Sequence, residues 1–379
     1  MLLFLWLAGH GTLDYFGKPV GSDFTAFWNA GRIADTGDPV RAWEQRLLND
    51  AIRATHGTEY GTAWIYPPVF LLLATPLGAL PYLPAVLLWQ FLSLAAVAVV
   101  LKEILGNRLD TLVALASPLT PMVLANGQNS YFTASLVGAG LLLGARRPLL
   151  GGSAFGCLIY KPQLGMIIGP LLLFSRNWRA LLGAAAAAMA LIGLSILLWG
   201  VSCWPAWIDS LRYGRFYMEQ GSVGFYKSAS LFAMMRGWGA GVDQAYFVQI
   251  VGVIGAVAMM WKMRRGPAFV QAAAACAAVA LTTPYFVDYD MAVVGIGAAF
   301  FYAGVREGFL PYERSVLAFI WIEPWISRPA AQYALLPLGP IATLLLIGIA
   351  WRRVRQGIAI PPLTCNVWPV TYPASRLER

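Results

Sequence analysis

The sequence predicts an all-α membrane protein with many spans, and three observations support this class. Of the 379 residues, 59% are hydrophobic and only 12% are charged, whereas a soluble domain normally has about 25% charged residues. Apolar runs recur along the chain at lengths near the ~20 residues that cross a bilayer as a helix. Basic residues cluster between these runs. The net charge of +9 therefore belongs to loops that flank a membrane and does not indicate nucleic-acid binding.

Nine apolar runs are candidate spanning helices. They lie at residues 84–101, 111–124, 131–143, 180–199, 246–261, 268–281, 291–302, 315–326 and 335–351. Several are short for a span, which fits helices that tilt little or that are broken by prolines such as Pro118 and Pro121.

The basic residues predict which side of the membrane each loop occupies. Six clusters recur at alternate loops: Lys102 with Arg108, Arg146-Arg147, Arg176 with Arg179, Lys262 with Arg264-Arg265, Arg306 with Arg314, and Arg352-Arg353-Arg355. All six can be cytoplasmic at once. We therefore expect residues 1–355 to form one domain in the inner (plasma) membrane, with large extracytoplasmic loops at 11–66 and 201–243 and a cytoplasmic tail at 356–379. Residues 1–9 are expected to be the second half of a first span.

Other site classes find little support in the sequence. The four cysteines form no Cys-x-x-Cys pair, and only two histidines are present, so neither a disulfide framework nor a metal site is predicted. No glycine-rich phosphate loop follows a strand, and no extramembrane segment is large enough for a nucleotide-sugar domain. We expect no cofactor.

Asp23 is the first candidate functional residue. After it, Phe24, Phe27, Trp28 and Gly31 share one helical face, which predicts an amphipathic helix lying in the membrane interface. The carboxylate at its start is either the N-cap of that helix or a catalytic base. Farther on, the proline-punctuated run from Tyr66-Pro67-Pro68 predicts a short element that returns to the interface before the span at 84–101.

Lys161 lies midway between two cytoplasmic basic clusters. About fourteen residues of helix on either side cover only about 21 Å, less than the ~30 Å core. Lys161 is therefore expected at the tip of a short hairpin, below the outer interface. A lysine there needs an anion or a water-filled cavity, and a phosphate is the natural partner. The alternative is a side chain that snorkels to the outer headgroups.

Two other outward segments carry unusual polar residues. The turn 125–130 holds Asn126 and Gln128; Asn-Gly is ordinary turn chemistry, whereas the amide of Gln128 suits sugar hydroxyls. The segment 283–291 contains Asp288 and Asp290, which could cap the next helix, bind an acceptor, or bind a metal.

These motifs, in this order, resemble glycosyltransferase family 87, the polyprenyl-phosphate-mannose-dependent mannosyltransferases of the GT-C fold. The resemblance rests on Asp23-Phe24 with Phe27-Trp28, on Tyr66-Pro67-Pro68, on Gly127-Gln128, on Lys161-Pro162 and on Tyr289-Asp290. It implies a bundle of about 10–12 transmembrane helices, and an enzyme that moves a sugar from a polyprenyl phosphate to a lipid or glycan hydroxyl outside the cell. Asp23 is then the general base of an inverting displacement.

The resemblance and the predicted topology together assign the remaining roles. Cations near the leaving phosphate are expected from Lys161, Lys227, Arg212 and Arg215. The segment 224–232 resembles a family loop, although Lys227 stands where a neutral amide is expected. Sugar or acceptor contacts are expected from Trp28, Asn29, Tyr66, Asn126, Gln128, Gln163, Asp288 and Asp290. The rival hypotheses are a transporter or flippase of lipid-linked saccharides and a structural subunit of an envelope assembly.

Overall fold

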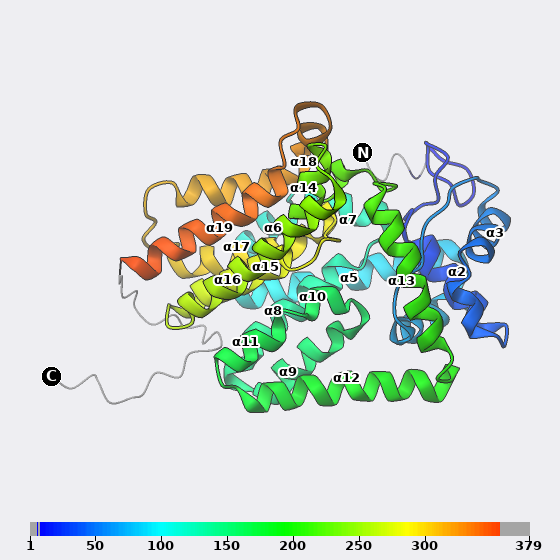
Figure 1. Cartoon of the computed structure of the whole chain (residues 1–379), viewed down its shortest axis with the longest axis horizontal. Coiled ribbons are helices and arrows are strands. Elements are labelled where there is room, and N and C mark those ends of the chain that lie inside the picture. The colour runs from blue at the N-terminus through cyan, green and yellow to red at the C-terminus, as the bar shows by residue number, and fades with distance from the viewer. Residues whose placement is uncertain (1–5, 7, 357–379) are drawn as a thin grey trace.

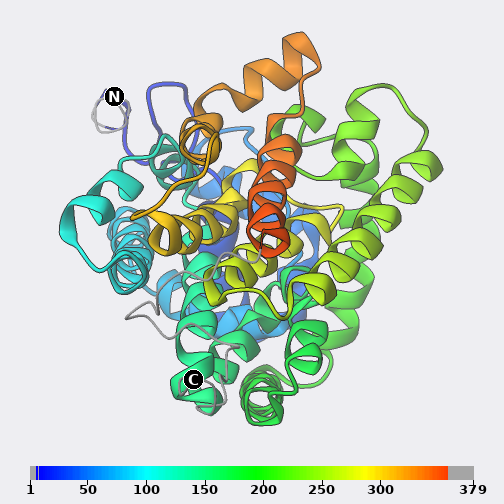
Figure 2. The same ribbon diagram turned by 90° about the vertical axis from the view of Figure 1, so that its left-hand side faces the viewer.

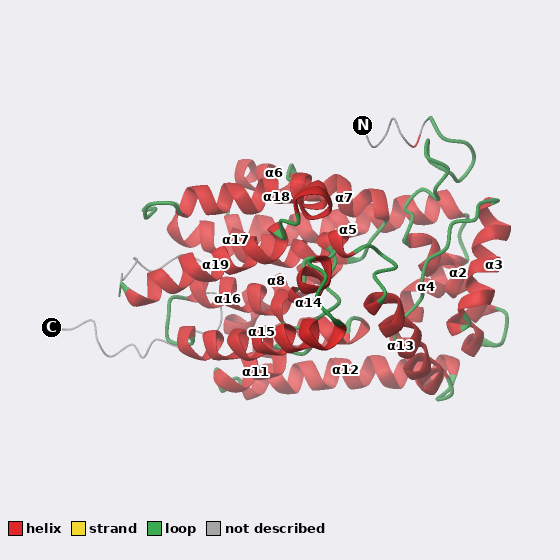
Figure 3. Cartoon of the chain, turned by 45° about the horizontal axis from the view of Figure 1, so that its top comes forward, coloured by secondary structure: helices red, strands yellow, loops and turns green. Residues whose placement is uncertain are grey.

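The computed structural model describes residue 6 and residues 8–356, and these residues form helices joined by loops and isolated β-bridges. The expected first span and most of the expected cytoplasmic tail lie outside the described residues. Figure 1 shows a bundle of long, roughly parallel helices with the N-terminal helices α2 and α3 at one end. Helices dominate the fold throughout, as the colouring of Figure 3 makes plain. The predicted all-α membrane class is confirmed.

Short helices precede the first long one. They are α2 (Phe24–Asp35), η1 (Pro39–Trp43), α3 (Gln45–His56), η2 (Pro68–Phe70) and α4 (Leu71–Gly78). The short element expected after Tyr66 is thus η2 with α4. The predicted helix after Asp23 is confirmed, and ten of its residues are buried within the protein. Only Arg32 and Asp35 of α2 are exposed, so packing against α3, α4 and α5 claims nearly every face.

Most of the bundle follows in two halves. The first comprises α5 (Tyr82–Leu105), α6 (Arg108–Leu115), α7 (Leu119–Asn126), α8 (Ser130–Arg146), α9 (Pro148–Gly156), η3 (Cys157–Tyr160), α10 (Pro162–Gly165), α11 (Ile168–Phe174) and α12 (Trp178–Trp199). The second comprises α13 (Cys203–Glu219), η4 (Phe225–Lys227), α14 (Leu231–Gly237), α15 (Val242–Met263), α16 (Ala268–Leu281), η5 (Asp288–Met291), α17 (Ala292–Val305), α18 (Glu313–Ala334) and α19 (Leu338–Arg355).

All nine predicted apolar runs coincide with helices. By length and composition, three described helices, α5, α12 and α15, can cross a membrane, and α6 with α7 forms a fourth candidate bent by 58°. The bend lies beside Pro118, where a helix interrupted by proline was expected. Several other apolar helices are shorter, including α16 and the two arms around Lys161, as the short runs in the sequence indicated.

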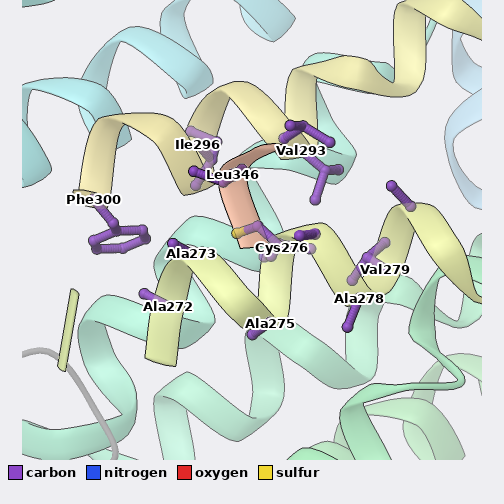
Figure 4. Close-up of a cluster of buried hydrophobic side chains, with 14 of the residues drawn as sticks. Ala272, Ala273, Ala275, Cys276, Ala278, Val279, Val293, Ile296, Phe300 and Leu346 are labelled. Atoms are coloured by element: carbon purple, nitrogen blue, oxygen red, sulfur yellow. The ribbon is translucent and has the colours of Figure 1, made fainter. Parts of the chain in front are cut away.

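The core of the bundle is centred on α16, in which every residue from Phe269 to Leu281 is buried. Figure 2 looks along the bundle and shows its long helices nearly end-on around this centre. In Figure 4, Ile296 of α17 and Leu346 of α19 lie on the same side of Cys276 of α16. Alanines along α16 let the backbones of neighbouring helices approach closely. In a bilayer, where the hydrophobic effect does not drive helices together, such packing of small residues drives their association. Cys276 is therefore a small buried apolar residue.

Candidate functional site

Two glycines bring the first loop against the turn between α7 and α8. Gly21 and Gly127 both have positive φ, +69° and +62°, a conformation that other residues rarely adopt. A Cβ on Gly127 would lie 3.0 Å from the Cα of Gly21 and 2.7 Å from the Cβ of Phe24. The backbone N–H of Asp23 then donates to the carbonyl of Asn126 over 2.8 Å. This close approach places the Asp23 side chain beside Gln128.

The Asp23 carboxylate accepts hydrogen bonds from two side chains. Gln128 Nε2 donates to Oδ2 at 2.6 Å, and the Tyr60 hydroxyl donates to Oδ1 at 3.4 Å. Asp23 occupies the N-cap position of α2, but its side chain makes no capping hydrogen bond, so it does not satisfy the free N–H groups of that helix. Tyr60 lies in the irregular segment between α3 and η2, where the sequence offered no pattern to identify it.

Burial raises the pKa of Asp23 above its ordinary value. The hydrogen bonds from Gln128 and Tyr60, and the charges of Lys227 and Arg328, lower that pKa in part. The balance leaves the carboxylate more basic than a solvated aspartate. In its ionised form such a carboxylate accepts a proton more readily, which is what a general base requires.

Lys161 forms a buried ion pair with Asp290. Its Nζ lies 2.8 Å from Asp290 Oδ1, and the two side chains are only 5% and 4% exposed. Ser130 Oγ donates to the same oxygen at 2.8 Å. Lys161 lies at the break between η3 and α10. Because its side chain is buried in this ion pair, it does not snorkel to the outer headgroups. The anion that it faces is a carboxylate of the chain itself.

Asp288 forms the second ion pair of the region. Arg328 of α18 approaches it with Nε at 2.5 Å from Oδ2 and Nη2 at 3.1 Å from Oδ1. Between the two aspartates, the Tyr289 hydroxyl accepts a second hydrogen bond from Gln128 Nε2, over 3.1 Å. The two carboxylates of η5 thus each hold a different cation, and neither caps α17, whose N-cap is Met291.

The loop that carries Lys227 is attached to the same segment. Ala229 N–H donates to the carbonyl of Phe286 at 2.7 Å, and Ser228 bridges to Val287. Lys227 is partly exposed, and its charge acts on both Asp23 and Asp288. Burial lowers the pKa of Lys227, and repulsion from Arg328 and Lys18 lowers it further. Two cations, Lys227 and Arg328, therefore act on Asp23 and repel each other.

Asp23, Gln128, Lys161, Asp288 and Asp290 with their partners form the candidate cluster. Four predicted residues lie away from it. Arg212 and Arg215 are exposed on α13, where Arg215 pairs with Glu219 at 2.6 Å. The indole of Trp28 donates to the carbonyl of Leu80 at 2.9 Å. Asn29 is occupied within its own region by Thr25 and Thr55.

The remaining predicted residues border the cluster. The Asn126 amide donates to Met122 O at 2.7 Å, which closes the end of α7. Gln163 is partly buried in α10, two residues after Lys161. Tyr66 stacks on Phe70 with ring centroids 4.6 Å apart, and its hydroxyl lies within electrostatic range of Asp290.

Asn129 is a site residue that sequence reasoning missed, although it stands between Gln128 and Ser130. It is fully buried beside Tyr66. Neither polar atom of its side-chain amide has a partner in hydrogen-bonding geometry. A buried amide that is not satisfied within the protein is costly, so it marks a point where a ligand hydroxyl could bind.

Comparisons with known proteins agree with the first resemblance. Two proteins named alpha-(1->3)-arabinofuranosyltransferase, from the CDC 1551 / Oshkosh and H37Rv strains of Mycobacterium tuberculosis, are each 34% identical to the chain over 139 residues. The match covers 32% of this chain and 31% of each relative, so the chain matches about a third of their length. No solved structure matches. The sequence model of glycosyltransferase family 87 matches residues 64–287, well over half of the chain, and the protein therefore belongs to this family.

Proposed function

We propose that the protein transfers a sugar from a polyprenyl-phosphate donor to a hydroxyl of a lipid or glycan acceptor, on the extracytoplasmic side of the plasma membrane. The observation that carries the proposal is the Asp23 carboxylate, which Gln128 holds at 2.6 Å and on which the charges of Lys227 and Arg328 act. The acceptor alcohol needs a base to take its proton, and the phosphate leaving group needs positive charge nearby. This site offers both. A transporter needs no such base, and none of the relatives is named as a transporter.

The proposed reaction is a single displacement. The acceptor oxygen attacks the anomeric carbon, and the bond from that carbon to the phosphate oxygen breaks. Asp23 takes the hydroxyl proton as the new bond forms, and the phosphate leaves with the bonding electron pair. Attack from the face opposite the phosphate inverts the anomeric centre.

Cations near the leaving phosphate stabilise the charge that develops on it. Lys227 is the first candidate, because it is partly exposed and makes no ion pair among the described residues. Lys161 already neutralises Asp290, so we assign it a supporting role. We propose that the exposed Arg212 and Arg215 attract anionic substrates as they enter the site.

Sugar recognition is proposed for the amides and hydroxyls beside Asp23. The side-chain amide of Asn129 makes no hydrogen bond of full geometry and can serve a sugar hydroxyl as donor or acceptor; Tyr66 lies beside it. The nitrogen of Gln128 already serves Asp23 and Tyr289. We therefore propose that Gln128 positions the base rather than the sugar.

The extracytoplasmic placement follows from the basic clusters. Arg306 donates to Leu105 O at 2.8 Å, and Arg352 donates to Pro311 O at 2.9 Å. These contacts join neighbouring clusters at one end of the bundle, opposite α2 and α3 (Figure 1). With that end cytoplasmic, Asp23 faces outward.

A donor panel tests the function and the sugar together. The purified protein in liposomes is supplied with mannose or arabinofuranose on polyprenyl phosphate, with GDP-mannose, and with membrane lipid extract as acceptor. Transfer is expected from a polyprenyl phosphate only. Mannose follows from the first resemblance, and arabinofuranose is the second candidate because the relatives are named for it. Transfer from GDP-mannose would contradict the proposal.

The variant Gln128→Leu is expected to move the acid limb of kcat/KM for transfer to higher pH by about one to two pH units. It removes a hydrogen bond to the charged form of Asp23, and that bond lowers the pKa of the base. The limb reports the free enzyme's base. Gln271→Leu is the control, since Gln271 is also buried but bonds Gly266 O at the far end of the bundle. An unmoved limb in Gln128→Leu would remove Asp23 from the role of base.

A further inference from the structure

A large apolar cavity lies between the helices on one side of the bundle. Its volume is about 460 Å³, and its walls come from α5, α6, α8, α17 and α18. Nearly all of the wall is aliphatic or aromatic, with Asp110 toward the basic-cluster end. No residue of this cavity has a part in the proposed displacement.

The inner end of the cavity touches the backbone of the candidate site. Met291 and Ala292, which line it, directly follow Asp290, and Tyr131 directly follows Ser130. Asp290 and Ser130 are themselves hydrogen-bonded to each other. The apolar wall therefore begins within one or two residues of the polar cluster.

One face of α18 joins the cavity to a cation. Leu317, Trp321 and Pro324 line the cavity at intervals of three or four residues, and Arg328 follows one turn after Pro324 on the same face. Arg328 is 32% exposed. Its guanidinium uses two N–H groups on Asp288, so three of its five donors are free for another anion.

The ligand that matches this geometry has a long hydrocarbon chain and a phosphate at one end. In a bilayer an apolar chain gains little by leaving lipid. The lining of this cavity on α18 stops at Pro324, one helical turn before Arg328, and a cation at that distance would fix where the phosphate lies. Resting on the proposed function, we infer that this cavity holds the hydrocarbon chain of the polyprenyl-phosphate donor, and that Arg328 binds its phosphate at the mouth.

The charges around the mouth support this orientation. Arg328 and Lys227 repel each other, and both act on Asp23. A phosphate placed against both cations would relieve this repulsion. The sugar attached to it would then extend toward Asp23, where its anomeric carbon must meet the acceptor hydroxyl.

Gly295 allows the cavity to be filled without disturbing the helix. It lines the cavity on α17, and a Cβ built on it meets nothing within 4 Å. Gly255 on α15 is the matched control, because its Cβ is equally free and it does not line the cavity. The test is equilibrium binding of two sugar-free probes, a long-chain polyprenyl phosphate and geranyl phosphate, to the full chain in detergent.

The wild type is expected to bind the long-chain probe more tightly than geranyl phosphate. Gly295→Leu should weaken long-chain binding about tenfold and leave geranyl phosphate unchanged, with Gly295→Ala intermediate and Gly255→Leu without effect. Arg328→Gln, combined with Asp288→Asn so that no carboxylate is left unpaired, should weaken both probes.

Equal effects of Gly295→Leu and Gly255→Leu on the long-chain probe would overturn the inference. So would an effect of Gly295→Leu on the KM of the acceptor alone, since the cavity would then hold the acceptor's chain. The readout is independent of transfer. Chain-length-dependent binding without any sugar transfer would refute the proposed function and uphold the lipid-phosphate site. Sugar transfer without chain-length-dependent binding would uphold the proposed function and refute the lipid-phosphate site.

Discussion

Replacing Asp23 by asparagine is expected to lower kcat for sugar transfer about a hundredfold to ten-thousandfold. The side-chain amide of the variant cannot take a proton, whereas its shape is that of the carboxyl group. Its oxygen can still accept from Gln128, and its nitrogen can donate to Tyr60. Substrate binding should therefore change little, so that kcat falls far more than KM rises.

Asp35→Asn is the matched control for this experiment. Asp35 ends the same helix, α2, and is exposed, so the variant makes the same chemical change outside the site. It is expected to transfer sugar at the wild-type rate. Undiminished transfer by Asp23→Asn, measured with the donor that the wild type uses, would refute the base assignment.

Stability provides a second readout on Asp23→Asn. Because the pKa of Asp23 is raised in the folded protein, this group stabilises the fold below its unfolded pKa and loses that contribution as pH rises through the folded pKa. At neutral pH the buried carboxylate costs stability. Asp23→Asn should therefore melt at the wild-type temperature or above it. A loss of transfer in this variant would then come from the missing base and not from unfolding.

Much of the fold was predictable because the bilayer imposes simple rules on sequence. Apolar runs marked helices such as α5 and α12, and Pro118 marked the bend between α6 and α7. The position of α2 was not predictable. Its apolar face fits a membrane surface as well as a protein interior, and only the packing of α3 and α4 against it decides between them.

The candidate site was predictable only residue by residue. Asp23, Gln128, Lys161 and Asp290 were each identified from local context, and the structure joins them in two connected groups. Their partners were not identifiable. Gln128 is 105 residues from Asp23, and Tyr289 is 161 residues from Gln128. Pairings at such separations leave no periodic signal, so Tyr60, Ser130 and Arg328 escaped the sequence patterns.

These pairings also connect η5 to two other parts of the chain. It carries two buried carboxylates in succession, and each has its own cation from a different part of the chain: Lys161 from the hairpin and Arg328 from α18. Two like charges this close repel unless both are paired. The ion pairs thus fasten three separate elements around Tyr289, whose hydroxyl supports Gln128 and through it the base.

Lys161→Met is expected to destabilise the protein by about 3–5 kcal/mol, because it leaves the Asp290 carboxylate buried without its cation. Ser130 alone remains as its donor. The double variant Lys161→Met/Asp290→Asn removes both charges and should recover most of the loss. The difference between the single and double variants, measured by thermal unfolding in one detergent, gives the coupling between the two groups. A single variant as stable as the wild type would show that the pair contributes nothing to the fold.

The same double variant separates the two roles open to Lys161. If the lysine serves only to neutralise Asp290, the recovered fold should transfer sugar with the wild-type KM for the donor. If it also binds the phosphate, as its place at the hairpin tip first suggested, the double variant should fold yet need more donor for half-maximal rate. We expect the second result. Arg328 and Lys227 would still hold the donor, so the rise in donor KM should be about tenfold or less. A donor KM equal to that of the wild type would assign Lys161 wholly to the structure of the site.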